Sequence, residues 1–193
     1  MTSRSALFAF LIVLAAVAKP SAAQNLLGGG LAFSNAEITG SGYRAEKQSS
    51  MLVAGQVSRF LRGGWRGSLS LAGTTDAETL YASIGASYHF RPLVPNVDAP
   101  SEYVDYRIVS DWSPYVGMDF GFNRVQLSLA RADGTQTDAV IGALVGPGVR
   151  AGTYYSLNAE WALQAEVAMS YAFSSAVASS AQTLTIFAVY LLP

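Results

Sequence analysis

The sequence contains no cysteine, a single histidine and few charged residues. The absence of cysteine excludes a disulfide framework, thiolate metal sites and a lipid-modified N-terminal cysteine. With His89 as the one histidine, a metal site would have to rest on carboxylates, and no calcium-loop spacing is present. The sequence therefore predicts no metal and no cofactor.

No hydrophobic run is long enough to cross a membrane as a helix. The longest run, Ala6 to Ala18, is much shorter than the roughly 20 residues that a spanning helix needs. It follows Arg4 and precedes small residues that end at Ala23, which is the pattern of a cleavable secretory signal peptide. We expect cleavage between Ala23 and Gln24; cleavage after Ala18 and an uncleaved anchor are the alternatives.

Removal of residues 1–23 would leave residues 24–193 as one domain, with no linker rich enough to divide it. The mature chain would keep one lysine, Lys47. Because phosphate binding needs clustered lysine and arginine, nucleic acid is not an expected partner.

Hydrophobic residues nevertheless make up 51% of the chain. In the mature part they recur at every second position, which is the period of a strand with one apolar face. The clearest predicted outward set is Trp161, Leu163, Ala165, Val167, Met169 and Tyr171. The residues between them are small or polar, as expected for the lumen of a barrel.

Eight such segments are predicted, and together they indicate an all-β, antiparallel up-and-down transmembrane barrel. Their approximate bounds are 27 to 38, 50 to 62, 64 to 73, 78 to 91, 114 to 131, 137 to 152, 159 to 173 and 181 to 192. Turn residues such as Asp133-Gly134 separate them. An even strand number returns both termini to the periplasm.

A barrel of ten strands is the open alternative. The outward phase changes at Asn123-Arg124, which would then form a turn, and residues 102 to 109 would supply a further strand. With eight strands, residues 92 to 112 form a long connection. Pro147 is expected to require a β-bulge, because proline has no N–H to donate to the ladder.

Aromatic residues give an independent test of strand order, because barrels carry aromatic girdles at both membrane interfaces. Six of them fall at predicted periplasmic strand ends: Trp65, Phe90, Tyr115, Tyr154, Trp161 and Tyr190. We expect these six residues to form the periplasmic girdle.

Several stretches resemble small bacterial outer-membrane β-barrels. They are Pro114-Tyr115-Val116-Gly117, the Asp-Gly loop, the glycine-rich return strand and the turn leading into Leu163-Gln164-Ala165-Glu166. The resemblance is to the outer-membrane protein A transmembrane domain and the opacity-type surface proteins, over residues 114 to 192 and more weakly over 27 to 91. It implies an outer-membrane location and insertion by the barrel-assembly machinery, although Leu192 stands where that family usually has a C-terminal aromatic residue.

Arg150 and Glu166 are the best-defined polar pair. Both face the predicted lumen, and a hairpin centred on residue 158 would place them opposite each other. We expect a structural ion pair, since a buried charge needs a partner, with a gate or proton site as the alternative. Asp119 is a candidate third charge beside this pair in the lumen; the sequence does not fix its register against the other two residues.

No catalytic residue is predicted. Phe33-Ser34-Asn35-Ala36 resembles a His-x-Ser-Asn-Ala segment of lipid A deacylases, but Ala32 stands at the histidine position. Ser87 and His89 share a face, without a carboxylate placed to orient the imidazole. The sequence therefore predicts that the protein is not an enzyme, and a lipid A acyl hydrolase is the less favoured alternative.

Recognition is expected in the outer loops, which vary freely on a rigid scaffold. The first loop, near residues 40 to 50, carries the mixed-charge set Tyr43, Arg44, Glu46 and Lys47. It could meet lipopolysaccharide or a host surface; loops without a specific partner are the alternative. The expected function is a structural or surface-interaction role in the bacterial envelope, and the competing one is a narrow channel or carrier for small apolar molecules.

Overall fold

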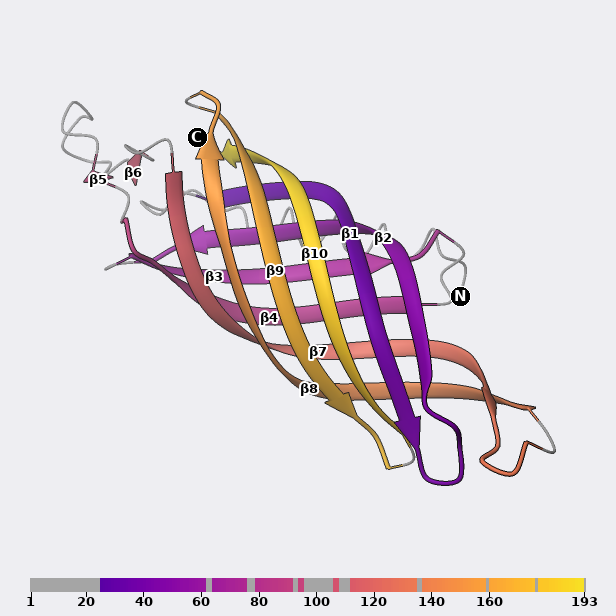
Figure 1. Cartoon of the computed structure of the whole chain (residues 1–193). Helices are drawn as coiled ribbons and strands as arrows, with labels where there is room; N and C mark the ends of the chain where they lie inside the picture. The colour runs from indigo at the N-terminus through magenta and orange to yellow at the C-terminus, as the bar shows by residue number, and fades with distance from the viewer. Residues whose placement is uncertain are drawn as a thin grey trace.

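Eight long antiparallel strands close into a barrel in the computed structural model (Figure 1). The structure describes residues 25–61, 64–75, 79–91, 94–95, 106–107, 112–134, 137–158, 160–175 and 177–192. The barrel strands are β1 (Asn25–Gly40), β2 (Glu46–Phe60), β3 (Trp65–Gly73), β4 (Thr79–His89), β7 (Trp112–Ala130), β8 (Thr137–Ser156), β9 (Trp161–Phe173) and β10 (Val177–Leu192). The expected signal peptide and its cleavage site lie outside the described residues. Within the described part of the chain, no helix is long and apolar enough to cross a membrane.

Two short strands, β5 (Val94–Pro95) and β6 (Tyr106–Arg107), pair with each other outside the barrel. The eight-strand prediction is therefore confirmed, and the ten-strand alternative is wrong. Asn123 and Arg124 lie inside β7, paired without a break to β4 and β8. Asn123 is buried and Arg124 is exposed, so the outward phase does not change between them.

The expected bulge at Pro147 is also absent. Val145 pairs with Phe173 and Gly148 with Ser170, so the register of β8 against β9 is the same on both sides of the proline. On the other side, Pro147 pairs with Phe120. The missing N–H is accommodated by a gap in the ladder to β9, where neither Gly146 nor Pro147 is paired, and no extra residue is inserted.

The two faces of the wall differ as the alternating pattern predicts. Outward side chains such as Leu163, Val167 and Met169 are exposed, whereas Gln164 and Glu166 on the same strand are buried. Apolar residues also enter the lumen at its two ends. One cluster, the periplasmic plug, comprises Leu26, Ala32, Leu52, Ala54, Phe60, Tyr115, Tyr154, Ala162, Phe187, Val189 and Leu191. The other, the outer plug, comprises Ile38, Leu144, Ala172 and Val177, with Tyr43 packed against it.

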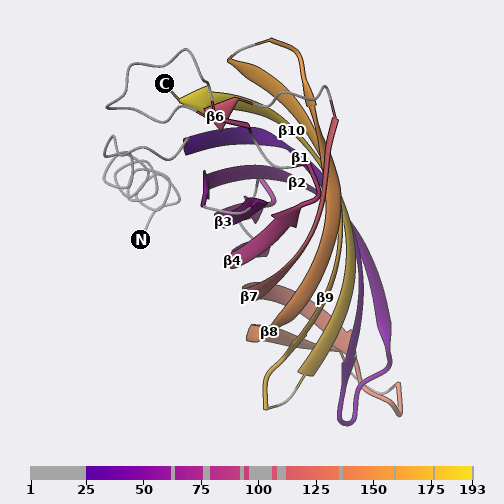
Figure 2. The ribbon, with the colours of Figure 1, turned by 90° about the vertical axis from the view of Figure 1, so that its left-hand side faces the viewer.

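The first and last strands form the seam of the barrel. β1 and β10 pair along their full length, from Asn25 opposite Leu192 to Gly40 opposite Val177. They run side by side in both views (Figures 1 and 2). The start of β1 and the end of β10 therefore lie at one end of the barrel, the expected periplasmic end.

The hairpin of β3 and β4 is shorter than its neighbours at the outer end. Pairing of β2 with β3 stops at Val53 opposite Gly73, and pairing of β4 with β7 stops at Thr79 opposite Val125. Above these points, β2 pairs only with β1 and β7 only with β8, among the described residues. The outer parts of β2 and β7 thus present edges across a gap in the wall.

A contact between two loops closes the top of this gap. The Arg44 N–H donates to the Ala130 carbonyl at 2.9 Å, and the Ala132 N–H donates to the Gly42 carbonyl at 2.8 Å. Tyr43 forms an isolated antiparallel bridge with Arg131 between these two bonds. We call this contact the outer clasp.

Candidate functional site

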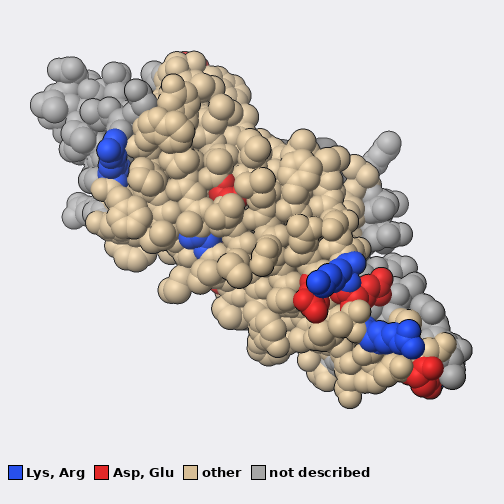
Figure 3. Space-filling view, in the orientation of Figure 1, with Lys and Arg blue, Asp and Glu red and all other residues tan. Residues whose placement is uncertain are grey.

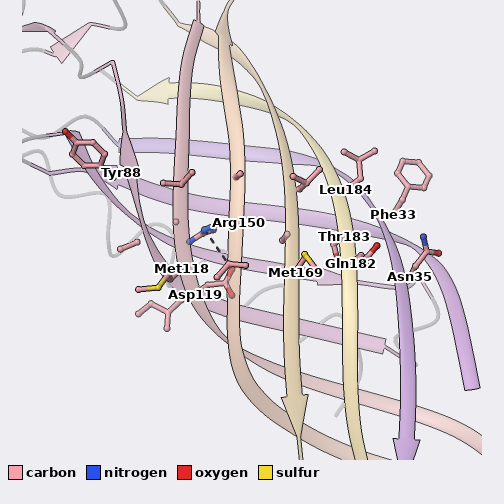
Figure 4. Close-up of a pocket in the computed structure, with 18 of the residues that line it drawn as sticks. Phe33, Asn35, Tyr88, Met118, Asp119, Arg150, Met169, Gln182, Thr183 and Leu184 are labelled. Atoms are coloured by element: carbon pink, nitrogen blue, oxygen red, sulfur yellow. Dashed lines mark ion pairs between the residues drawn. The ribbon is translucent and has the colours of Figure 1, made fainter. Parts of the chain in front are cut away.

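The centre of the lumen holds a network of charged side chains around Arg150. Its Nη1 lies 3.8 Å from Glu166 Oε2, and its Nε lies 3.9 Å from Asp119 Oδ2. Figure 4 shows the contact with Asp119. Arg150 Nη2 also donates to Ser68 Oγ at 2.7 Å, so one side chain on β8 reaches β3 across the lumen. The guanidinium is therefore held on three sides by groups from β3, β7 and β9.

The structure brings together the three charged residues that the sequence placed in the lumen, but not in the expected register. Arg150 pairs with Ala168 and Glu166 with Gly152, so the two charges are diagonal neighbours rather than direct partners. The prediction of a hairpin centred on residue 158 is wrong, because Ser156 pairs with Ala162 and the hairpin is centred on residue 159. The long side chain of Arg150 spans the offset.

Inward glycines make room for these side chains. A Cβ at Gly85 would collide with Arg150 Nη2 and with the Met118 carbonyl, and a Cβ at Gly148 would collide with Asp119 Oδ1. A narrow barrel leaves little space between facing walls. The glycines therefore let Arg150 and Asp119 lie flat against neighbouring strands.

Tyr115 links the charges to the polar residues below them. Its hydroxyl donates to Glu166 Oε2 at 2.7 Å and accepts from Gln164 Nε2 at the same distance. Gly152 lies against this hydroxyl, where a Cβ would stand 2.6 Å from the oxygen. Glu166 is thus bound by a cation on one side and by a phenol on the other.

A second arginine fills the periplasmic half of the lumen. Arg66 is fully buried, its Nε donates to Ser87 Oγ at 3.1 Å, and its guanidinium carbon lies 4.8 Å from the ring centroid of Tyr115 and 5.0 Å from that of Tyr154. Such stacking on aromatic faces stabilises a desolvated cation. Arg66 was not among the residues predicted for the lumen, although its position next to outward Trp65 makes it inward by alternation.

The serine and histidine considered for a deacylase do not act on each other. His89 Nδ1 lies 3.0 Å from Ser113 Oγ, and its ring stacks on Tyr115, while Ser87 accepts from Arg66. Both Ser87 and His89 are fully buried. Ser87 and His89 therefore do not form the hydrogen-bonded nucleophile and base that were considered for a deacylase.

Among the described residues, a small cavity lies in the lumen between the two plugs. Its volume is about 120 Å³, and its lining includes Asp119, Arg150, Glu166, Asn123 and Ser170. Within the described residues, no group of three or more histidine, cysteine, aspartate or glutamate side chains is placed to hold a metal ion. The cavity has room for a few water molecules among fixed charges.

The prediction of the aromatic girdle is wrong for two of its six residues. Tyr115 and Tyr154 are buried inside the barrel, because their positions have inward parity even though they lie at strand ends. Trp65, Phe90 and Trp161 are exposed, and Tyr190 packs against Trp161. The girdle also contains residues that were not predicted, in the exposed ring pairs Trp65–Tyr88, Tyr88–Phe90 and Trp112–Tyr155.

The four residues expected in the first outer loop divide between two settings. Glu46 and Lys47 belong to β2, so the prediction that the loop extends from 40 to 50 is wrong, and both side chains are exposed on the wall. Tyr43 packs against the outer plug, and Arg44 lies beside Gly134 of the next outer loop. The pairing of Tyr43 and Arg44 with a distant loop has no local signal in the sequence.

These features together define a small outer-membrane β-barrel: eight antiparallel strands, an apolar outer wall, an aromatic girdle and a polar lumen. The chain is located in the bacterial outer membrane. It is similar to the Opacity family porin proteins, whose family model matches residues 93–183.

Solved structures support the fold. Over 89% of this chain and 100% of the other, Neisserial surface protein A is 16% identical, with a TM-score of 0.52. The outer membrane protein OprG from Pseudomonas aeruginosa is 11% identical, covering 89% of this chain and 96% of its own, with a TM-score of 0.53. No match was found among curated protein sequences.

Proposed function

We propose that this protein is a sealed outer-membrane barrel that acts in the envelope through its outer surface rather than by passing solutes through its lumen. The observation that carries the proposal is the filling of the lumen. Arg150 crosses the barrel to Ser68, and the cavity of about 120 Å³ around it lies between two apolar plugs. A path for ions would have to displace charged side chains from their partners, which is costly in a medium of low dielectric constant.

Conductance in planar lipid bilayers tests this proposal. The wild-type barrel should show no steady open-pore current. A variant that shortens the side chains across the lumen, Arg150→Ala with Phe187→Ala, should conduct more than the wild type. Steady porin-like conductance of the wild type would reject a sealed barrel.

The surface role needs a separate test in cells. Deletion of the chain should lower the resistance of the outer membrane to detergent or weaken attachment to surfaces, and the wild-type chain should restore it. The variant Arg44→Pro, which removes one donor of the outer clasp, should restore it less well than Arg44→Ala, which keeps that donor. Unchanged resistance and attachment in the deletion strain would reject the proposed role.

The gap above the β3–β4 hairpin favours a second candidate, a carrier for small apolar molecules. The lumen cavity lies just below this gap and is lined there by Leu52, Leu71 and Tyr81. Passage between cavity and outer leaflet would require movement of the outer clasp. Uptake of a small aromatic hydrocarbon that a cross-link between β2 and β7 abolishes would support this candidate over the first.

Export and insertion complete the proposal. Cleavage between Ala23 and Gln24 and recognition of the last strand by the barrel-assembly machinery are expected from the sequence pattern. In β10, Tyr190 faces outward two residues before Leu192 and supplies an aromatic residue of the required parity.

A further inference from the structure

The outer wall of the barrel is hollowed along one row of the register. A groove of about 1110 Å³ crosses seven strands, from β1 around to β3. Its apolar wall follows the directly paired residues Leu184, Val167, Ala151, Val116, Tyr88 and Trp65. Figure 4 shows part of this groove, with Met118 and Met169 in its middle and Phe33 and Leu184 towards one end.

The groove continues into a second hollow, which is also mostly apolar but adds charged and hydroxyl side chains at one wall. The second hollow has a volume of about 790 Å³ and shares Met118, Val149 and Met169 with the first. Its far wall is polar and contains Lys47, Ser49 and Ser180. The two hollows therefore form one amphipathic groove.

Polar outward side chains begin at one row of the register, which we take as the outer boundary of the membrane. Asn35 on β1 and Gln182 on β10 are direct partners, both exposed, and both line the two hollows. Below them the outward residues are Phe33 and Leu184, which are apolar. Charged residues of both signs cluster at this end of the molecule, whereas over the rest of the same face they are scattered singly (Figure 3).

We propose that this groove binds one glycolipid of the outer leaflet, with acyl chains along the outer half of the apolar part, away from the girdle residues Trp65 and Tyr88, and a phosphorylated sugar headgroup at Lys47. This inference rests on the outer-membrane placement of the barrel. The second hollow is large enough for a sugar headgroup, and its polar wall supplies an ammonium group, hydroxyls and amides, which suit a phosphate and sugar hydroxyls. Glu37, opposite Lys47 on β1, would accept from a sugar hydroxyl.

Native mass spectrometry of the folded full chain tests the proposal. The protein is extracted from micelles that contain equal amounts of bisphosphorylated lipid A and phosphatidylethanolamine, and the lipids retained are counted. The wild type should retain one lipid A and little phosphatidylethanolamine. Heat-dependent gel mobility verifies that each variant is folded.

Matched variants locate the site. Val149→Trp fills the junction of the two hollows, and Val53→Trp places the same side chain outside them; Val149 is 55% exposed and Val53 57%. Lys47→Gln removes the headgroup cation, and Arg124→Gln removes an exposed cation on β7 that lines neither hollow. Val149→Trp and Lys47→Gln should each lower lipid A retention about tenfold, the loss expected from one charge-assisted contact or from lost packing, and the controls should retain it.

Equal retention of the two lipids by the wild type, or equal retention of lipid A by Val149→Trp and Val53→Trp, would overturn the glycolipid site. Neither result bears on the sealed lumen, because all four substituted side chains face away from it. The conductance experiment can therefore reject the sealed lumen without affecting the glycolipid site, and the lipid-retention experiment can reject the glycolipid site without affecting the sealed lumen.

Discussion

At the scale of single residues, the glycines of the inner wall decide where the charges can lie. Gly85→Ala should destabilise the folded barrel, because the new Cβ would meet the Met118 carbonyl and the Arg150 side chain. Overpacking of this kind costs about 1 to 3 kcal/mol. Urea unfolding in lipid vesicles, followed by tryptophan fluorescence, measures the loss.

Gly29 and Gly67 provide matched controls for that substitution, because a Cβ at either position would meet nothing within 4 Å. Alanine there should change the free energy of unfolding by a few tenths of a kcal/mol at most. A loss at Gly67 as large as that at Gly85 would contradict the role given to space beside Arg150.

The partners of Arg150 are unequal. Glu166→Gln should cost about 3 to 5 kcal/mol, because it leaves a buried guanidinium without its more deeply buried carboxylate. Asp119→Asn should cost less, since the side chain of Asp119 is 14% exposed and can be solvated. The single change Glu166→Arg should destabilise the barrel, and adding Arg150→Glu should recover only part of the stability that it loses. The recovery is partial because Asp119 would then face a second carboxylate. If Asp119→Asn and Glu166→Gln lowered the free energy of unfolding equally, Glu166 would not be the main partner of Arg150.

Predictions for single residues were right where the alternation of side chains along a strand alone determines which face a residue takes. They were wrong or missing where the outcome depends on burial at the strand ends or on contacts across the lumen. Parity placed Arg150, Glu166 and Asp119 in the lumen. Strand-end position alone misplaced Tyr115 and Tyr154 in the girdle, although their parity is inward. The contact of Arg150 with Ser68 depends on the tilt and stagger of the closed barrel, which no local pattern encodes.

At the scale of elements, the outward apolar residues of a strand show which of them lies near the middle of the bilayer. On β9 the outward series begins at Trp161 and ends at Phe173, and Val167 lies at its centre. Val167→Arg should therefore cost about 2 to 4 kcal/mol, whereas Gln182→Arg, at the outer boundary, should cost about 0 to 1 kcal/mol. Unfolding in vesicles measures both, and a reversed order would place the membrane at another height.

The outer clasp is an element-scale contact that can be examined directly. The amides of Arg44 and Ala132 should exchange slowly with deuterated solvent, because both donate to backbone carbonyls of the facing segment. Arg44→Pro removes one donor and should speed exchange at Ala132. Arg44→Ala keeps the donor and should leave exchange at Ala132 unchanged; faster exchange there would assign the protection to the arginine side chain instead.

All eight strands were predictable from the sequence because a period of two is imposed by lipid on one side and the lumen on the other. Their ends were less predictable. β1 and β2 extend beyond the apolar band, where Glu37 and Lys47 replace lipid-facing residues and the hydrophobic signal stops. The clasp joins residues far apart in the sequence and lies beyond any periodic signal.

At the scale of the whole molecule, the barrel should behave as one cooperative unit. Unboiled outer-membrane fractions should contain a form with a different electrophoretic mobility from the boiled form, because the closed sheet resists detergent. Mass spectrometry of this folded form should find an N-terminus at Gln24. A soluble periplasmic product without a mobility shift would contradict both the membrane location and the barrel.

The seam between β1 and β10 sets the order in which such a molecule can be completed. All other barrel neighbours are hairpin partners except β4 and β7, but the seam joins the first barrel strand to the last over 16 residues of β1. Contacts of the greatest sequence separation are the slowest to form, because the intervening chain must first be ordered. Closure of the seam should therefore limit the rate of folding, and until it closes the chain carries two long unpaired edges, each a template for aggregation. We therefore expect the time spent in this open-edged state, more than the final stability, to set how much of the protein is lost to aggregation before it reaches the membrane.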